Sequence, residues 1–268
     1  MNDVAAKDRE TAKWDPAFCK QVVDTVAPAI KLWHRAEVRN VDNIPAAGGA
    51  LVVSNHSGGM FTPDVFILSP AFYEAFGYDR PIYTLGHYGL FMGPIGDWLR
   101  RVGVIEASRE NAAAALHSDA VVLVFPGGDY DSYRPTLGAN TVDFNGRTGY
   151  ISTAIEAGVP IVPTVSIGAQ ETQLFLTRGN WLARRLGLNR FRSDILPVSF
   201  GFPFGLSVFF PPNVPLPAKV VTEVLEPIDV LAEFGADPDI AEVDAHVRAV
   251  MQSALDRLAG QRRLPILG

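Results

Sequence analysis

The chain has 268 residues, of which 48% are hydrophobic and 19% charged, and its net charge is -6 at pH 7. This length and composition suffice for one large domain with a substantial core. The acidic balance argues against nucleic acid as a partner, because proteins that bind it usually carry a basic excess. The single cysteine, Cys19, excludes an internal disulfide bond and a cysteine-based zinc site, and is compatible with a reducing cytosol.

The N-terminal region predicts a helix preceded by a polar stretch. Residues 1–15 are polar and charged, with no apolar segment typical of a secretory signal. Asp15-Pro16 is a typical helix start, and apolar residues then recur every three or four positions to about residue 38. This stripe is expected either to pack on the main body or to lie partly on a membrane. We therefore divide the chain into a helical extension, residues 1–38, and a main domain, residues 39–268.

The main domain alternates between β-like and helix-like segments. Apolar runs typical of buried strands occur at 49–55, 81–86, 102–106, 120–125, 159–168, 206–210 and 218–226. Helices are predicted at 64–76, 93–102, 109–118, 148–157 and 243–258, with Gly158 as a cap. Strands separated by helices predict an α/β fold with a mostly parallel central sheet flanked by helices.

One uncharged stretch, residues 195–218, is long enough to cross a bilayer, but its six prolines and two glycines make a continuous spanning helix improbable. Its phenylalanine pairs, Phe202/Phe204 and Phe209/Phe210, are candidates for contact with a membrane interface. The alternative, which the short apolar run 206–210 favours, is a buried strand.

A histidine and an aspartate bracket the loop that follows the first of these strands. His56 comes directly after the strand, where parallel sheets carry reactive groups. Histidine is the usual general base near neutral pH, and a carboxylate on its far nitrogen fixes the tautomer. Gly58 and Gly59 would allow Asp64 to fold back onto His56. Asp64 could alternatively cap the following helix.

Two further segments carry charges that suit an anionic ligand. Arg109 follows a strand and opens a helix, so it is a candidate anion ligand or a surface arginine paired with a neighbouring glutamate. After the run that ends at Phe125, Gly127 and Gly128 form a turn that can offer N–H groups to an oxyanion, and Arg134 adds charge. Asp129 and Asp131 also allow a competing interpretation, a D-x-D metal site.

These blocks, with Val159-Pro160-Ile161-Val162-Pro163, resemble in order those of the glycerolipid acyltransferase superfamily, the PlsC-like lysophospholipid acyltransferases. The resemblance covers residues 40–230. Seven residues separate His56 from Asp64 instead of the usual four, Phe61 stands at the usual aspartate position, and Gly127 replaces an acidic residue. Both departures resemble the monoacylglycerol/diacylglycerol acyltransferase-like branch.

The resemblance implies O-acyl transfer from acyl-CoA or acyl-ACP to a glycerolipid hydroxyl, with no bound cofactor or metal. His56, oriented by Asp64, would deprotonate the acceptor, Gly127 and Gly128 would stabilise the oxyanion, and Arg109 and Arg134 would hold a phosphate. An apolar groove for the acyl chain has four candidates, Phe61, Phe66, Phe91 and Met92. The expected location is peripheral, on the cytoplasmic face of a membrane.

Three other functions remain open on sequence alone. A lipid ester or thioester hydrolase would use water in place of the acceptor, although the chain has no G-x-S-x-G motif. A D-x-D glycosyltransferase would depend on a metal ion, and a lipid carrier would keep the groove without needing His56.

Overall fold

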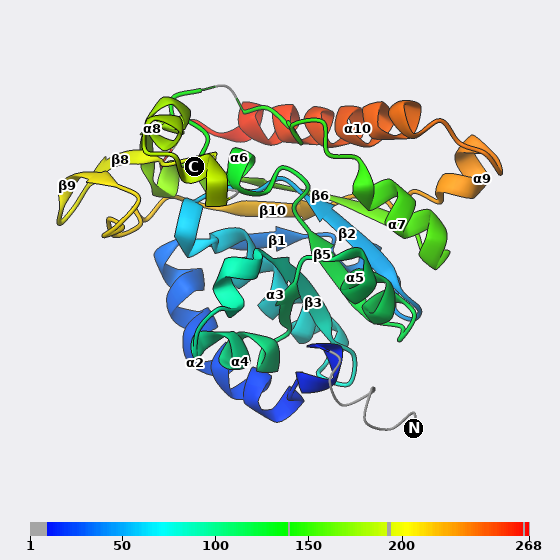
Figure 1. Cartoon of the computed structure of the whole chain (residues 1–268). Coiled ribbons are helices and arrows are strands. Elements are labelled where there is room, and N and C mark those ends of the chain that lie inside the picture. The colour runs from blue at the N-terminus through cyan, green and yellow to red at the C-terminus, as the bar shows by residue number, and fades with distance from the viewer. Residues whose placement is uncertain (1–9, 139, 192–193, 265, 268) are drawn as a thin grey trace.

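A computed structural model describes residues 10–138, 140–191, 194–264 and 266–267, so the polar stretch 1–9 lies outside the described residues. Its centre is a seven-stranded sheet in the order β1-β10-β6-β2-β5-β3-β4 (Figure 1). The strands are β1 (Glu37–Arg39), β2 (Ala50–Ser54), β3 (Ile82–Gly86), β4 (Val104–Glu106), β5 (Val121–Val124), β6 (Ile161–Ile167) and β10 (Val221–Val224). All neighbours run parallel except β10 and β6, which are antiparallel. The predicted mostly parallel sheet is confirmed.

Strand β2 lies at the centre of the sheet and carries the loop that matters for function. Val52 is in register with Leu123 of β5 on one side and Val162 of β6 on the other, and every β2 residue is buried. Such a strand reads as a continuous apolar run because helices cover both faces of the sheet. The loop after β2 therefore begins from a rigid, fully paired support.

Helices form a layer on each face of this sheet (Figure 1). Leu51 and Val53 of β2 pack into the core cluster formed with α5, α7 and α10, whereas Ala50 and Val52 pack into the cluster formed with α2 and α3. The longer helices are α2 (Pro16–Trp33), α3 (Pro63–Phe76), α4 (Ile95–Arg101), α5 (Arg109–Leu116), α7 (Gly149–Ala157) and α10 (Ile240–Gln261). Three short helices are α6 (Gly128–Ser132), α8 (Asn180–Arg185) and α9 (Val230–Phe234). Gly158 has a φ of 64° and caps α7 as predicted.

The N-terminal helix is present but shorter than predicted. The Asp15 side chain accepts the Phe18 N–H at 3.0 Å, so the predicted cap is confirmed. The predicted end near residue 38 is wrong, because α2 stops at Trp33. Arg35 has a φ of 43°, which ends the helical path, and Val38 lies in β1, in register with Thr222 of β10. The helix packs on α3 and buries Cys19, so it contacts the main body.

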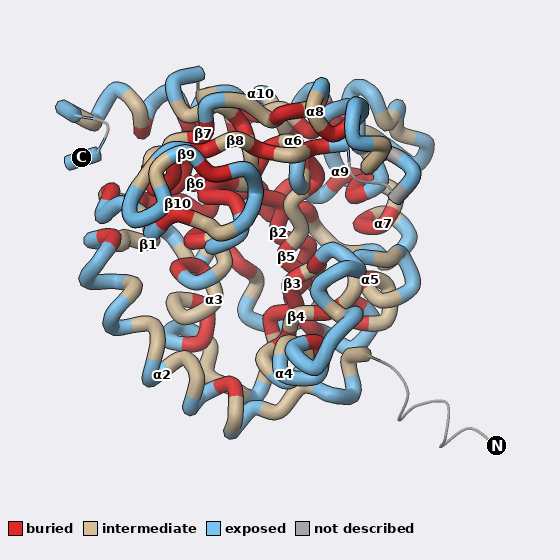
Figure 2. The backbone as a smooth tube through the Cα atoms, turned by 60° about the vertical axis from the view of Figure 1, so that its left-hand side comes forward, coloured by how far each residue is buried: buried red, intermediate tan, exposed pale blue. Residues whose placement is uncertain are grey.

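A second sheet of three antiparallel strands, β7 (Leu174–Thr177), β8 (Val198–Gly201) and β9 (Gly205–Val208), projects at the left of Figure 1. The strand predicted near 206–210 is confirmed as β9, but its predicted burial is wrong, since Leu206 is 64% and Phe210 72% exposed. Figure 2 shows the buried residues running through the main sheet, while the β9 loop lies at the surface. In the described ranges no helix is long and apolar enough to cross a membrane.

Candidate active site

The loop from β2 to α3 brings His56 and Asp64 together. His56 Nδ1 lies 3.1 Å from Asp64 Oδ2, and both side chains are largely buried, with 13% and 3% exposed. Gly58 and Gly59 have φ angles of 81° and 60°, and a Cβ on Gly58 would lie 2.4 Å from the Pro63 ring. The predicted contact and the need for both glycines are confirmed. The catalytic role of the pair stays a prediction.

Asp64 is not the cap of the following helix. Helix α3 begins at Pro63, its N-cap residue is Thr62, and Asp64 lies in the first turn. Its Oδ2 also accepts the backbone N–H of Ser57 at 2.8 Å. The carboxylate thus holds the ring of His56 and the backbone of the next residue, so the capping alternative is wrong.

The imidazole of His56 is fixed in one orientation. A carboxylate can only accept, so the Asp64 contact places the proton on Nδ1 and leaves the lone pair on Nε2. In the described part of the chain, Nε2 has no hydrogen-bond partner. The Phe125 ring, just after β5, stacks on the imidazole with centroids 4.2 Å apart. The arrangement leaves Nε2 able to accept a proton, which is the property that a general base requires.

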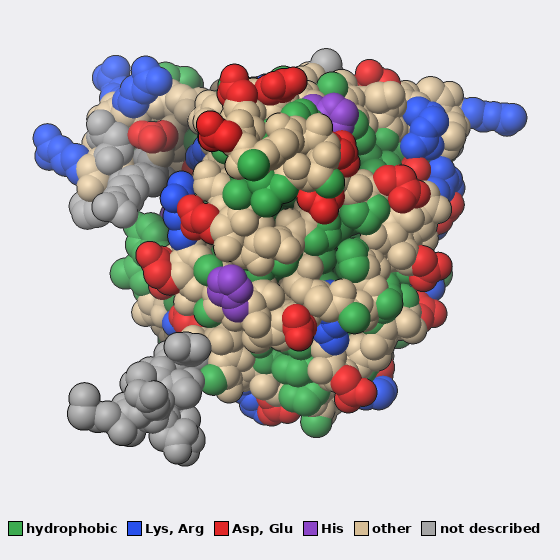
Figure 3. Space-filling view, turned by 90° about the vertical axis from the view of Figure 1, so that its right-hand side faces the viewer, with side chains coloured by type: hydrophobic (Ala, Val, Ile, Leu, Met, Phe, Trp, Pro, Cys, Tyr) green, Lys and Arg blue, Asp and Glu red, His purple; other side chains and the backbone are tan. Residues whose placement is uncertain are grey.

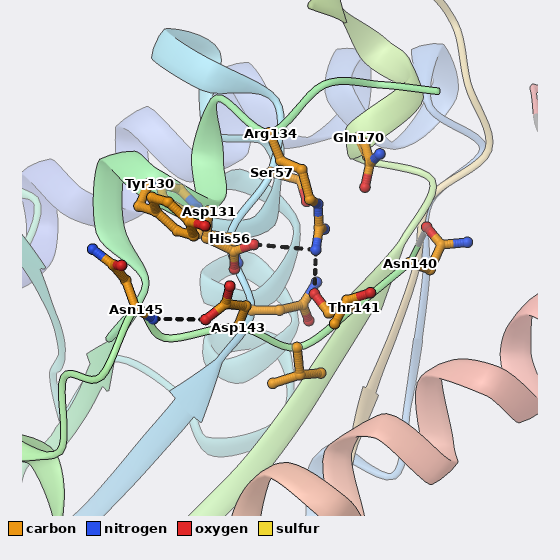
Figure 4. Close-up of polar contacts among 12 residues, drawn as sticks. His56, Ser57, Tyr130, Asp131, Arg134, Asn140, Thr141, Asp143, Asn145 and Gln170 are labelled. Carbon is orange, nitrogen blue, oxygen red and sulfur yellow. Dashed lines mark hydrogen bonds and ion pairs between the residues drawn. The ribbon is translucent and has the colours of Figure 1, made fainter. Parts of the chain in front are cut away.

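A second carboxylate, Asp131 of α6, holds the backbone of His56. Its Oδ2 accepts the His56 N–H at 2.7 Å, and its Oδ1 lies 3.4 Å from Nη1 of Arg134. Arg134 also donates to the carbonyl of Thr141 (Figure 4). Burial raises the pKa of Asp131 to about 6, although Arg134 acts in the opposite direction. The sequence identified Asp131 only as half of a D-x-D pair and missed this role.

The D-x-D metal interpretation is contradicted by the two aspartates' partners. Asp129 is at the surface, where it pairs with Arg147 at 3.1 Å, whereas Asp131 is buried against His56 and Arg134. Their carboxylates therefore do not converge on one ion. Within the described residues, no group of three His, Cys, Asp or Glu side chains is placed to hold a metal.

The turn at Gly127 and Gly128 keeps one free amide. The Gly128 N–H donates to the carbonyl of Phe125 at 2.9 Å, so it is not available to an oxyanion as predicted. The Gly127 N–H has no partner among the described residues and stays a candidate. Arg147, which the sequence did not single out, donates to the carbonyls of Pro126 and Gly127 at 3.2 and 2.9 Å. It supports the turn from outside.

The two predicted phosphate ligands differ in exposure. Arg134 is buried and paired with Asp131, which contradicts its predicted role as a substrate ligand. Arg109 is exposed at the start of α5, with no hydrogen bond or ion pair to any described residue. Arg109 follows β4 and His56 follows β2. Two strands, β5 and β3, lie between β4 and β2, so Arg109 is not brought against His56. Its anion-binding role stays a prediction.

The four predicted groove residues lie at or near the surface. Phe61, Phe66 and Met92 are exposed, and Phe91 is half-buried beneath the Arg100 guanidinium. Phe61 lies in the short 3-10 helix Gly59–Phe61, within the His56 loop. It lines a narrow cleft whose other apolar walls are Met60, Tyr133, Phe175, Pro197, Phe209 and Pro212. This cleft connects the His56 loop with the second sheet.

Comparison with known proteins gives consistent results. Residues 35–167 match the model of a family described as "Acyltransferase". An uncharacterized protein of Mycobacterium tuberculosis is 33% identical over 93% of this chain and 69% of its own length. A Bos taurus protein named "DGAT1/2-independent enzyme synthesizing storage lipids" is 26% identical over 87% of this chain and 67% of its own. The crystal structure of the Thermotoga maritima 1-acyl-sn-glycerophosphate acyltransferase, PlsC, has the same fold, with a TM-score of 0.51 and 17% identity over 89% of this chain and 82% of its own.

Proposed function

We propose that this chain, which belongs to the acyltransferase family, moves a fatty acyl group from acyl-CoA or acyl-ACP to a hydroxyl of a glycerolipid. The observation that carries the proposal is the His56–Asp64 pair after β2, with Nε2 of His56 left without a partner among the described residues. An acyltransferase of this kind needs a base that removes the proton of the acceptor hydroxyl. The imidazole of His56 suits this role, because Asp64 holds Nδ1 and leaves Nε2 to accept the proton.

In the proposed reaction, His56 Nε2 takes the proton of the acceptor hydroxyl, and the oxygen attacks the thioester carbonyl carbon. Asp64 stabilises the imidazolium ion that forms. The tetrahedral oxyanion accepts a hydrogen bond from the Gly127 N–H. The C–S bond then breaks, the imidazolium returns its proton to the leaving thiolate, and the new ester departs.

The transfer is direct and needs no acyl-enzyme. The chain has no G-x-S-x-G motif, and its only cysteine is enclosed in α2. Burial raises the pKa of the Cys19 thiol, which opposes formation of the nucleophilic thiolate. The base-assisted attack of a hydroxyl therefore accounts for catalysis with the residues that are present.

The acceptor is proposed as a lysophospholipid or a mono- or diacylglycerol, reached from the cytoplasmic face of a membrane. The Bos taurus relative is named for synthesis of storage lipids, which supports a neutral acceptor. Gly127, where the related blocks carry an acidic residue, supports the same branch.

Incubation with labelled acyl-CoA or acyl-ACP and a panel of lysophospholipids, glycerol phosphate, mono- and diacylglycerol tests the proposal. We expect one acceptor class to be acylated and His56→Ala to lower the rate by about 100-fold or more. Undiminished transfer by His56→Ala would contradict the mechanism. The same assay detects free fatty acid, so a hydrolase would be recognised by release without acceptor. EDTA is expected to leave the rate unchanged, whereas a metal-dependent glycosyltransferase would lose activity.

A further inference from the structure

The hairpin of β8 and β9 is apolar on its outer face and polar on its inner face. Ser199 and Ser207 are opposite one another in the register and are only 6% and 5% exposed. On the other face, Phe200 is opposite Leu206, and these side chains are 53% and 64% exposed. Successive residues of a strand point to opposite faces, so the alternation is clear. An antiparallel sheet with water on its outer side has its polar residues outward and its apolar residues inward, and this hairpin has the opposite arrangement.

The turns at the hairpin enlarge this apolar surface. Phe202 and Phe204 in the connecting turn are 77% and 54% exposed, and Phe210 after β9 is 72% exposed. We call the exposed side chains together the hairpin face: Phe200, Phe202, Phe204, Leu206, Val208 and Phe210. Figure 1 shows that β8 and β9 project from the edge of the molecule, so the hairpin face is accessible. Six exposed apolar side chains on one hairpin are typical of a contact site.

Cations flank the hairpin face although the whole chain is acidic. Arg184, Arg185 and Arg190 are exposed and have no ion pair with a described residue, whereas the chain as a whole has a net charge of -6. Arg184 and Arg185 end α8 and both are exposed; the start of α8 is tied to the segment that leads into β8, because the Asn180 side chain donates to the carbonyl of Asp194 at 2.9 Å. The face on the opposite side of the molecule, shown in Figure 3, carries acidic groups among its cations. A basic rim around an apolar patch is complementary to an anionic lipid surface.

The cleft beside Phe61 joins the hairpin to the candidate active site. Phe61 belongs to the His56 loop, and Pro197 and Phe209 flank β8 and β9. Tyr133 and Phe175 pack edge to face between them, with ring centroids 5.3 Å apart. The hairpin and the His56 loop are therefore in contact through apolar side chains.

We propose that the hairpin face inserts into the interface of an anionic membrane, with Arg184 and Arg185 contacting lipid phosphates. This inference rests on the proposed function only in identifying the membrane as the source of the lipid substrate. A second copy of the chain is a less suitable occupant. Pairing of two hairpin faces would bring the basic rims of both copies together, and like charges repel.

Co-sedimentation with vesicles of phosphatidylglycerol and phosphatidylcholine, 3:7, tests the proposal on the full chain. We expect Phe202→Ser/Phe210→Ser to lower the partition coefficient by at least about tenfold, since burial of one phenylalanine changes a partition constant by roughly this factor. Leu231→Ser is the matched control, because Leu231 of α9 is 43% exposed at the other end of the molecule. Unchanged binding by the hairpin variant, or equal loss by the control, would overturn the proposal.

The contribution of charge has its own pair of variants. Arg184→Glu/Arg185→Glu should reduce binding to the anionic vesicles by about tenfold or more, whereas Arg184→Lys/Arg185→Lys should retain it. Equal binding by both would overturn the role of the basic rim. Light scattering of the protein without vesicles tests whether a second copy of the chain covers the hairpin face. A dimer that becomes a monomer in the hairpin variant, while vesicle binding is unchanged, would show that the hairpin face binds a second copy and would overturn the proposal.

Acylation of a water-soluble acceptor, monobutyrin, separates this inference from the proposed function. The hairpin variants should acylate monobutyrin at the wild-type rate and fail only with acceptors presented in vesicles. Activity on both with unchanged vesicle binding would refute the docking surface and leave the function standing. Hairpin-dependent binding without acyl transfer to any acceptor would refute the function and leave the docking surface standing.

Discussion

The backbone N–H of His56 donates a 2.7 Å hydrogen bond to Oδ2 of Asp131, a residue 75 positions later in the chain. The ring of the same histidine is held by Asp64 at 3.1 Å. Ser132, next to Asp131, adds a hydrogen bond from its hydroxyl to the carbonyl of Gly59. Helix α6 and the His56 loop are thus one unit, and the imidazole is fixed through its ring and through its backbone.

Replacements of Asp131 and Arg134 should have strongly coupled effects on stability, because the two side chains form a buried ion pair. Asp131→Ala leaves a buried arginine without its partner, and we expect it to lower the free energy of unfolding by about 3 kcal/mol. Arg134→Met should cost a similar amount, and the double variant should cost about 1–3 kcal/mol less than the two single changes together. Urea denaturation of the four proteins measures this coupling. Simple additivity would show that the 3.4 Å contact is not an interaction.

Replacing Asp64 should impair the reaction more than binding. Asp64→Asn keeps the volume but no longer stabilises the imidazolium ion, so we expect kcat to fall by about 100-fold to 10,000-fold with KM nearly unchanged. Asp97→Asn is the control, because the Asp97 side chain is 81% exposed and far from the loop in sequence. A wild-type kcat for Asp64→Asn would mean that His56 works without its carboxylate.

Gly127 should not tolerate a side chain. A Cβ there would lie 2.6 Å from Cβ of Asp131 and 2.9 Å from the carbonyl oxygen of Asp143. Gly127→Ala must therefore displace the segment that holds His56, and we expect a loss of about 1–3 kcal/mol in unfolding free energy together with reduced activity. Gly260→Ala in α10 meets no atom within 4 Å and should be neutral or stabilising by about 0.5–1 kcal/mol. Equal effects of both variants on thermal unfolding would contradict this prediction.

His34 should make stability depend on pH. Burial lowers the pKa of His34 below its ordinary 6.5, so the unfolded chain binds a proton more readily than the folded one. The stabilisation is present above about pH 6.5, the ordinary pKa of histidine, and is lost as the pH falls through the lower folded value. His34→Gln can still donate to the Ala218 carbonyl and should show a flatter decline of unfolding free energy between pH 7 and 5. Parallel curves for the two proteins would be evidence against a buried neutral histidine.

The sequence predicts the central part of this fold well because the core strands are mainly apolar and several helices have a clear start or stop signal. β2, β5 and β6 are paired on both sides and almost entirely buried, and Gly158 ends α7 where predicted. Edge elements carry weaker signals. β1 has three half-buried residues, so the pattern extended α2 into it. The antiparallel direction of β10 depends on the path of the chain, which periodicity does not encode.

The candidate site was predictable where neighbours in sequence are neighbours in space. His56 and Asp64 lie on one loop, and the glycines between them imply a turn. The role of Asp131 was not predictable, because a buried carboxylate bound to a backbone N–H looks the same in sequence as an exposed one. The predicted roles of Arg134 as a phosphate ligand and of Asp129 as a metal ligand were wrong for the same reason. Their partners, Thr141 and Arg147, are set by tertiary contacts.

In β8 and β9 the apolar side chains face outward and the serines face inward. This alternation links the solubility of the protein to its proposed binding of lipid. Phe200 and Leu206 contribute little to the interior, since the serines on the other face take that position. A redesign that replaced these exposed side chains to raise solubility would keep a well-folded protein. With the hairpin face docked on a membrane as we propose, the same redesign would remove the attachment to lipid. A variant selected for high yield in detergent-free buffer is then expected to lose activity on vesicles and to keep it on soluble acceptors.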